Sequence, residues 1–269
     1  MKLGLALSGG AARGLAHVGV IEVLEREGVQ IDMVAGTSMG AIIGAAYARG
    51  LSAEDIKTEA HDVGWRKLVP LVDLNPLQPS GLIGARRIRR RLVDFIGDLD
   101  FSELKKPFAC VATDIYTGEA VVFTRGSVLD AVIASMTLPL VFKVPRVGRR
   151  YLVDGGLSDP LPVEPLKHLG ADKVIAVNVL KNLGLTPPHR SREHPLPRHA
   201  PNILQVATQV IYIASAHLAE ACMKGADVAI EPDMTGIHLA DFNLAGEAIQ
   251  CGEKAARKAM PQIRELLAQ

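Results

Sequence analysis

A serine between two glycines is the feature of this sequence with the clearest chemical meaning. Gly36-Thr37-Ser38-Met39-Gly40 follows an apolar segment and precedes a helix-like pattern. The glycines permit a sharp strand-to-helix turn that lifts the serine hydroxyl to the end of a sheet, as in a nucleophile elbow. The alternative is a serine that only caps a tightly packed helix. We take Ser38 as the candidate nucleophile, with the turn supported by Gly36, Met39 and Gly40.

A second glycine-rich turn, Ser8-Gly9-Gly10-Ala11-Ala12-Arg13-Gly14, ends the first apolar segment. Its glycines let backbone N–H groups face an anion at a helix N-terminus. A dinucleotide site would need a third glycine in place of Ala11 and an acidic residue after the second strand. A nucleotide P-loop would need Gly-Lys-Ser/Thr, which is absent. An oxyanion site remains, with the candidate residues Gly9, Gly10, Ala11, Arg13 and Gly14.

The candidate nucleophile needs a base, because a serine hydroxyl is weakly nucleophilic until a group accepts its proton. Asp154 directly follows a predicted strand, and Gly155 and Gly156 leave space around it. An ordinary Asp-Gly turn would have the same residues. Asp114, which ends the predicted strand 109–113, is the rival acid. No histidine stands in a recognisable motif, so all eight are interpreted as surface or packing residues: His17, His61, His168, His189, His194, His199, His217 and His238.

Short apolar strands alternating with helices would position these residues. The strands are expected at 3–7, 31–35, 107–114, 119–124 and 173–179, near Val228, and in a hairpin over 144–154 with Gly148 at its tip. Helices are expected at 14–27, 38–49, 202–223 and 244–268, and two more begin at the capping boxes Ser52-x-x-Asp55 and Ser127-x-x-Asp130. This rhythm predicts parallel strands with right-handed crossovers. Their carboxyl ends would bring the two glycine turns side by side.

Taken together, the loop 8–14, the elbow 36–40 and Asp154-Gly155-Gly156 resemble the patatin-like phospholipase family. Their order and spacing match its glycine-rich loop, serine elbow and Asp-Gly-Gly/Ala motif. The resemblance covers at least residues 3–180, and Ala11 departs from it where the family often has a third glycine. It implies a three-layer α/β/α fold with a mainly parallel central sheet.

The resemblance also implies a function and roles for the site residues. It implies a Ser38–Asp154 dyad instead of a triad, and hydrolysis of lipid or lipid-like acyl esters through an acyl-enzyme. Gly10 and Ala11, with Gly9 or Met39, would hold the oxyanion through backbone N–H groups, and Arg13 would hold the loop in place. No metal-ligand set is visible, so we expect no cofactor and no calcium requirement. A regulatory protein that binds lipid or a partner without turnover, and an acyltransferase, remain as alternatives.

The composition limits the organisation and the partners. The chain has 269 residues, is 48% hydrophobic and carries a formal net charge of +1, which gives no general attraction to nucleic acid. We expect a single domain over 1–269, with a motif-bearing core at about 3–180 and C-terminal helices at 202–269. The segment 181–201 is rich in Pro, His and Arg, and either an entrance lid or a disordered connector fits it.

Several features bear on the location of the protein. The first apolar run ends at Gly9-Gly10, too early for a signal peptide, which predicts a buried first strand. No apolar stretch is expected to be long enough to span a bilayer. The three cysteines, an odd number without metal-ligand spacing, are interpreted as buried thiols in a reducing compartment: Cys110, Cys222 and Cys251. We expect a soluble cytoplasmic protein that makes at most transient contact with a membrane surface.

An arginine-rich segment at 85–92 has two interpretations. The favoured one is a helix whose apolar stripe of Ile88, Leu92 and Ile96 packs inward while the arginines remain in water. The alternative is docking on anionic lipid headgroups.

Overall fold

The structure is a computed structural model that describes residues 1–62, 81–139, 141–181, 183 and 203–268. Within these residues eight strands form one mixed sheet, in the order β5-β6-β3-β2-β1-β7-β8, with β4 also paired to β3. The pairs that link β3, β2, β1, β7 and β8 are parallel, whereas β4, β5 and β6 run antiparallel to their neighbours. The strands are β1 (Leu3–Leu7), β2 (Met33–Thr37), β3 (Phe108–Asp114), β4 (Ala120–Phe123), β5 (Arg146–Val147), β6 (Arg150–Asp154), β7 (Lys173–Val177) and β8 (Val228–Ile230).

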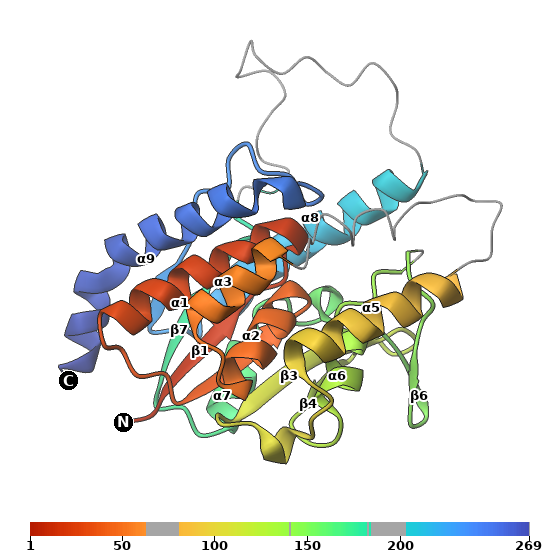
Figure 1. Ribbon diagram of the computed structural model, residues 1–269, viewed down its shortest axis with the longest axis horizontal. Coiled ribbons are helices and arrows are strands. Elements are labelled where there is room, and N and C mark those ends of the chain that lie inside the picture. Colours follow the sequence, from red (N-terminus) through yellow and green to blue (C-terminus); the bar gives the residue numbers. More distant parts are fainter. Residues whose placement is uncertain (63–80, 140, 182, 184–202, 269) are drawn as a thin grey trace, which may run out of the picture.

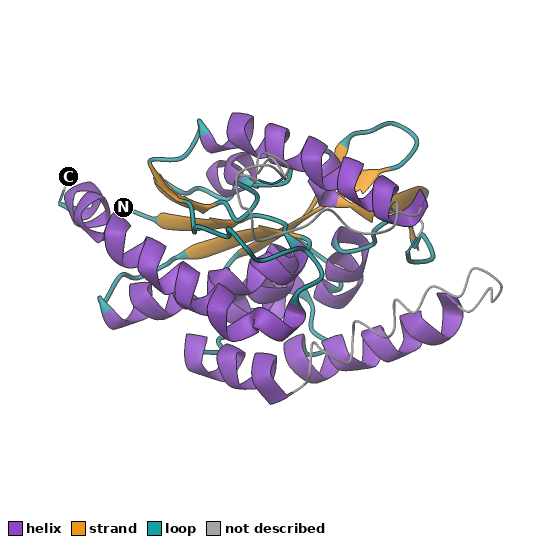
Figure 2. Cartoon of the chain, turned by 90° about the horizontal axis from the view of Figure 1, so that it is seen from above, coloured by secondary structure: helices purple, strands orange, loops and turns teal. Residues whose placement is uncertain are grey.

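Helices cover both faces of the sheet (Figures 1 and 2). Along β1 the side chains of Leu3, Leu5 and Leu7 face one layer and Ala6 faces the other, as the two-residue period of a strand requires. The first layer contains α1 (Ala16–Arg26), α2 (Met39–Arg49), α3 (Ala53–Asp62), α5 (Gly81–Ile96), α6 (Val128–Ser135) and α9 (Ala245–Leu267), and the second contains α7 (Val163–His168) and α8 (Ile203–Met223). The predicted three-layer architecture with a mainly parallel sheet is confirmed.

The element boundaries follow the sequence patterns closely. β1 has the predicted bounds, and the hairpin turns at Gly148, whose φ is 60°. The capping box at Ser52 forms, because Asp55 N–H donates to Ser52 Oγ and Ser52 N–H donates to Asp55 Oδ2. At Ser127 the described residues form only the N-cap half, in which Asp130 N–H donates to Ser127 Oγ. The second strand begins at Met33 instead of residue 31. The reason is that the Asp32 carboxylate, in place of a backbone carbonyl, accepts the N–H of Leu3 at 2.7 Å.

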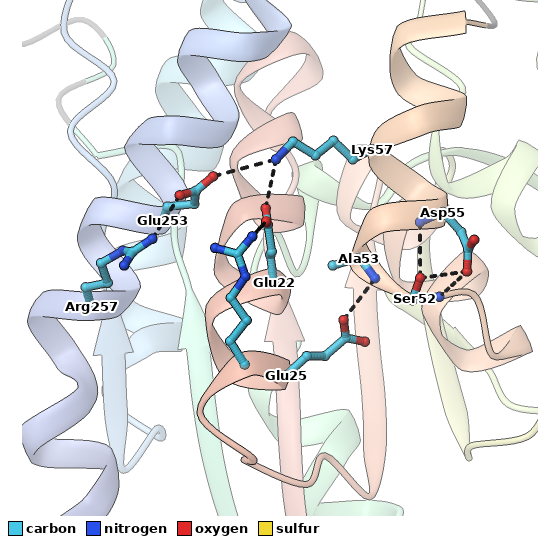
Figure 3. Close-up of polar contacts among 9 residues, drawn as sticks. Glu22, Glu25, Ser52, Ala53, Asp55, Lys57, Glu253 and Arg257 are labelled. Atoms are coloured by element: carbon cyan, nitrogen blue, oxygen red, sulfur yellow. Dashed lines mark hydrogen bonds and ion pairs between the residues drawn. The ribbon is translucent and has the colours of Figure 1, made fainter.

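The helical layer in front of the sheet is held by close packing and by charge. A side chain at Gly19 of α1 would meet the carbonyl oxygen of Ile249 in α9 at 2.0 Å, so glycine lets the two helices touch. Glu22 of α1 contacts Arg26, and Lys57 of α3 lies 3.1 Å from Glu22 and 3.8 Å from Glu253 of α9 (Figure 3). One lysine therefore links acidic side chains from two other helices.

Expectations about individual side chains have mixed outcomes. Ile88, Leu92 and Ile96 of α5 are buried, as predicted. Cys110 is buried, but Cys222 and Cys251 are partly exposed, so the prediction of buried thiols is right for the first cysteine alone. Residues 184–201 of the segment interpreted as a lid or connector lie outside the described residues.

The expectation that no stretch could span a bilayer is wrong as stated. Among the described residues, one helix is long and apolar enough to do so by length and composition, over Val206–Met223 of α8. The helix itself was predicted at 202–223, close to the observed bounds, but its apolar character was underestimated. Only 17% of this window is buried in the protein.

Candidate active site

Ser38 stands at a strained corner between β2 and α2. Its φ of 55° and ψ of −119° are unusual for a residue with a side chain, and strain of this kind is often found at functional sites. A Cβ on Gly36 would lie 2.2 Å from the carbonyl oxygen of Gly40, and a Cβ on Gly40 would lie 2.3 Å from that of Leu7. Both glycines are therefore required for the turn, which has the form of an elbow.

The pairing of β3 brings Asp154 to this corner. β2 ends where Thr37 pairs with Val111 of β3, and on the same edge of β3 the next residue, Ala112, pairs with Asp154. The two strands share this edge because β4 occupies the opposite one over residues 110–113. β6 thus approaches β2 end to end from the opposite direction. Its last residue meets Ser38, the first residue after β2.

A short hydrogen bond joins the two side chains. Ser38 Oγ donates to Asp154 Oδ2 at 2.7 Å, and Gly156 N–H donates to Asp154 Oδ1 at 2.8 Å. Burial raises the pKa of Asp154 to about 6, although the hydrogen bonds from Ser38 and Gly156 act in the opposite direction. A Cβ on Gly155 would lie 2.2 Å from the carbonyl oxygen of Val111, so only glycine fits at this position next to β3.

The glycine-rich loop lies against the elbow. Some of its backbone N–H groups are hydrogen-bonded within the protein and others are not. A Cβ on Gly9 would lie 3.4 Å from Cβ of Ser38, but the Gly9 N–H donates to Pro160 O, and Arg13 N–H donates to Gly10 O. The N–H groups of Gly10, Ala11 and Met39 have no partner among the described residues. These three amides are available to an anion beside Ser38.

Ala11 carries a conformational cost at this loop. Its φ of 47° is in the left-handed region, where a residue with a Cβ is less stable than glycine by about 1–2 kcal/mol. Gly14 is constrained in another way, because a Cβ there would lie 2.4 Å from Cγ of Met39. The departure from a third glycine at Ala11 is therefore tolerated under strain.

Two buried basic side chains hold the loop in place. Arg13 Nε donates to Ile237 O at 2.7 Å, and burial lowers the pKa of Arg13. His17 Nε2 lies 2.8 Å from Ser8 O, and this nitrogen must carry the proton because a carbonyl only accepts. Burial lowers the pKa of His17 to about 4, so this histidine is neutral near pH 7. Both residues contact the backbone of the loop or its neighbours.

The rival groups lie elsewhere. Asp114 accepts a hydrogen bond from Tyr116 N–H and forms an ion pair with Arg150 at 3.4 Å. Of the histidines whose surroundings the structure describes, none hydrogen-bonds to Ser38 or Asp154. His168, His217 and His238 are exposed, and His189, His194 and His199 lie outside the described residues.

Three residues near the pair were not predicted as site residues. Ser135 Oγ accepts the N–H of Ser38 at 2.8 Å, and Ser215 Oγ of α8 donates to Gly156 O at 2.7 Å. Tyr212, one turn earlier in α8, is buried, and its hydroxyl has no hydrogen-bond partner among the described residues. Burial, together with the charge of Asp154, raises the pKa of this phenol. The segment 131–135, which ends at Ser135, also resembles the family, but no local pattern marks Tyr212 or Ser215, because only tertiary packing brings α8 to the site.

Comparison with known proteins gives relatives over the whole chain. An uncharacterised NTE family protein of Mycobacterium tuberculosis is 33% identical over 291 residues, which cover 99% of this chain and 48% of that protein. Lysophospholipase NTE1 of Debaryomyces hansenii is 28% identical over 242 residues, which cover 83% of this chain and 15% of that protein. The chain spans about half the length of the first bacterial relatives it matches.

Solved structures and a family profile agree with this architecture. VipD from Legionella pneumophila has a TM-score of 0.52 at 14% identity, with 96% of this chain and 66% of that chain covered, which shows the fold alone. The profile described as patatin-like phospholipase matches residues 5–167, which include the elbow, the glycine-rich loop and Asp154. The chain belongs to the patatin-like phospholipase family.

Proposed function

We propose that this chain hydrolyses acyl esters of lipids with Ser38 as nucleophile and Asp154 as base. The observation that carries the proposal is the 2.7 Å hydrogen bond from Ser38 Oγ to Asp154 Oδ2 in a buried corner. Family membership and the similarity to lysophospholipase NTE1 of Debaryomyces hansenii support a lipid ester as substrate. Its place in the cell is proposed to be the cytoplasm, with transient contact at a membrane surface.

The first half of the reaction forms an acyl-enzyme. Ser38 Oγ attacks the acyl carbonyl carbon while its proton passes to Asp154 Oδ2, and the carbonyl π electrons become an oxyanion. The free amides of Gly10, Ala11 and Met39 are the donors for this oxyanion, and one such donor contributes about 3 kcal/mol. The intermediate then expels the alkoxide, which takes the proton from Asp154.

The second half releases the acid. Water attacks the acyl-enzyme and gives a proton to Asp154, and the collapse of the new intermediate returns that proton to Ser38 Oγ. A base must be ionised to accept a proton. With the Asp154 pKa raised to about 6, the carboxylate is mostly ionised at pH 7 yet binds a proton more readily than an exposed aspartate.

A fluorophosphonate probe tests this proposal. The probe forms a phosphonyl ester with an activated serine and loses fluoride, so we expect one labelled peptide, containing Ser38. Ser38→Ala should stay unlabelled while its thermal unfolding matches the parent. A folded parent protein without label would favour a regulatory role, and label on another serine would refute the assignment. Analysis of the products of a lipid ester in water separates hydrolysis, which yields free acid, from acyl transfer.

A further inference from the structure

One helix next to the candidate site presents an apolar face to solvent. Ile203, Val206 and Val210 of α8 are 82%, 40% and 58% exposed. The buried residues Tyr212, Ser215 and Ala219 occupy the other side of the helix, as the 3.6-residue period requires. Residues 203–219 contain no Asp, Glu, Lys or Arg. α8 is therefore packed against the protein along one stripe and uncharged and apolar along the opposite one.

This apolar stripe extends past the site. α8 leads into β8, which runs parallel to β7, so the helix N-terminus lies toward the carboxyl edge of the sheet, where Ser38 stands. Ser215 contacts Gly156 beside Asp154. Ile203 is twelve residues earlier, which corresponds to about 18 Å of helix beyond that contact. The start of α8 and the β5–β6 hairpin lie at the end of the molecule opposite to both chain termini (Figures 1 and 2).

The β5–β6 hairpin at this end is aromatic and cationic. Tyr116 and Tyr151 are 81% and 40% exposed and pack edge to face at 5.9 Å. Arg146 lies over the Tyr151 ring at 5.9 Å, and Lys143 and Arg149 are also exposed. The sequence has no acidic residue between Asp130 and Asp154, and the acids that face the hairpin from β3 and the following turn, Asp114 and Glu119, pair with Arg150. Exposed tyrosines beside arginines suit the boundary between lipid headgroups and acyl chains.

We propose that the N-terminal half of α8 and the β5–β6 hairpin together dock on the surface of an anionic phospholipid bilayer. The helix stripe would enter the acyl boundary, and Arg146 and Arg149 would contact anionic headgroups. The value of this docking for catalysis rests on the proposed lipid hydrolase function, since α8 contacts Gly156 and β6 ends at Asp154. The docking itself is independent of turnover.

Charge and packing favour this occupant over two others. A membrane-spanning helix would have to give up the contacts of Tyr212, Ser215 and Ala219 with the rest of the protein. A two-fold contact centred on the hairpin would bring its exposed arginines close to those of the second copy, and these like charges repel. The arginine-rich helix α5 is a weaker candidate for lipid, because Arg89 pairs with Asp130 at 2.6 Å.

Vesicle co-sedimentation tests the surface, with the full chain carrying Ser38→Ala so that no lipid is consumed. We expect binding to vesicles of phosphatidylcholine mixed with phosphatidylglycerol. Val206→Asn with Val210→Asn should lower the partition coefficient about tenfold. Arg146→Gln with Arg149→Gln should lower it about fivefold per arginine on anionic vesicles, with a smaller change on pure phosphatidylcholine. Thermal unfolding checks that each variant is folded.

Matched controls come from α9, at the far end of the molecule. Leu267→Asn removes another exposed apolar side chain and Arg257→Gln another exposed arginine, so both should bind vesicles as the parent does. The proposal would be overturned if the parent did not bind vesicles, or if the valine and arginine double variants bound them as tightly as the parent does. A parent dimer that the valine substitutions convert to monomer, measured by light scattering, without vesicle binding, would also overturn it.

The membrane-docking proposal and the hydrolase proposal can be tested separately. Hydrolysis of a soluble short-chain ester by the Ser38 protein, without vesicle binding, would refute the docking surface alone. Vesicle binding by the Ser38→Ala protein, with no ester hydrolysis by its Ser38 parent, would refute the hydrolase function alone.

Discussion

Asp154 and Glu22 are both buried carboxylates, but their surroundings are opposite. Their exposed fractions are 3% and 4%. Glu22 lies between two cations, Arg26 and Lys57, and the latter also reaches α9 (Figure 3). Within the described residues Asp154 has no cationic partner, and its oxygens accept hydrogen bonds from the Ser38 hydroxyl and the Gly156 amide.

This difference separates a structural carboxylate from one suited to proton transfer. Nearby cations compensate the loss of hydration when a carboxylate is buried, so Glu22 can connect helices as an anion. Neutral donors compensate less, and burial then raises the proton affinity of Asp154. Burial alone does not distinguish these two carboxylates; the donors around each of them, cations for Glu22 and the Ser38 hydroxyl and Gly156 amide for Asp154, do.

The largest expected effect is on catalysis at Asp154. Asp154→Asn removes the proton acceptor while keeping the shape, so kcat/KM on a short p-nitrophenyl ester should fall roughly 10²–10⁴-fold. The matched control is Asp114→Asn, which removes an acid paired with Arg150 and should keep most of the activity. An equal fall in kcat/KM for the two variants would show that Asp154 is no more important for the reaction than Asp114.

A smaller effect is expected on the pH dependence of stability. The pKa of Asp154 is raised to about 6 in the folded protein, so its neutral form stabilises the fold at low pH, and this stabilisation is lost as pH rises from about 4 to about 6. Asp154→Asn imitates the neutral form. It should match the parent near pH 4 and become more stable above pH 6, by up to about 3 kcal/mol.

Urea unfolding of both proteins across this pH range measures the difference. The neighbouring groups Asp159 and His17 titrate in the same way in the two proteins, so their contributions cancel. A constant difference at all pH values would show that Asp154 does not titrate in this window.

Glu22 should respond in the opposite sense. Glu22→Gln leaves Arg26 and Lys57 without their shared carboxylate, and we expect a loss of about 2 kcal/mol of unfolding free energy, less than for fully buried cations because both reach water. Ester hydrolysis at a temperature where the variant is folded should be unchanged. If Glu22→Gln lost activity but kept its unfolding free energy, Glu22 would not be a purely structural carboxylate.

The smallest expected effect is on an exposed ion pair, which tests whether burial determines how much a pair contributes to stability. Arg257 pairs with Glu253 on the same face as Glu22, but its side chain is 61% exposed (Figure 3). Arg257→Gln should change the unfolding free energy by only about 0.5 kcal/mol. If Arg257→Gln lost as much unfolding free energy as Glu22→Gln, exposed and buried ion pairs would stabilise this group of helices equally.

Much of the fold could be predicted because local patterns and tertiary structure agree. The period of the apolar residues places β1, and Gly50 ends α2 in the left-handed conformation at a φ of 104°. The start of β2 was missed because a side chain, that of Asp32, takes over a backbone role. The bounds of α8 were predicted closely, but the apolar character of this helix was underestimated because its uncharged run contains small and polar residues.

The candidate site was predictable in its residues but not in its geometry. Glycines around Ser38 and after Asp154 leave a trace in the sequence because a Cβ would clash with backbone: with the elbow itself at Gly36, and with neighbouring strands at Gly40 and Gly155. The end-to-end meeting of β2 and β6 depends on register along β3, and no single segment encodes it. The same holds for the engaged amide of Gly9 and for Tyr212, which become visible only when distant segments are packed together.

The pH dependence of kcat/KM for a soluble ester, measured on the parent and on Asp154→Asn, tests the central claim most directly. We expect the parent rate to rise with pH through about 6, as Asp154 loses its proton, and the variant to be slow at every pH without this rise. A variant that keeps the parent rate and profile would contradict the Ser38–Asp154 mechanism. A rise that disappears only when a histidine is replaced would assign the base to that histidine instead.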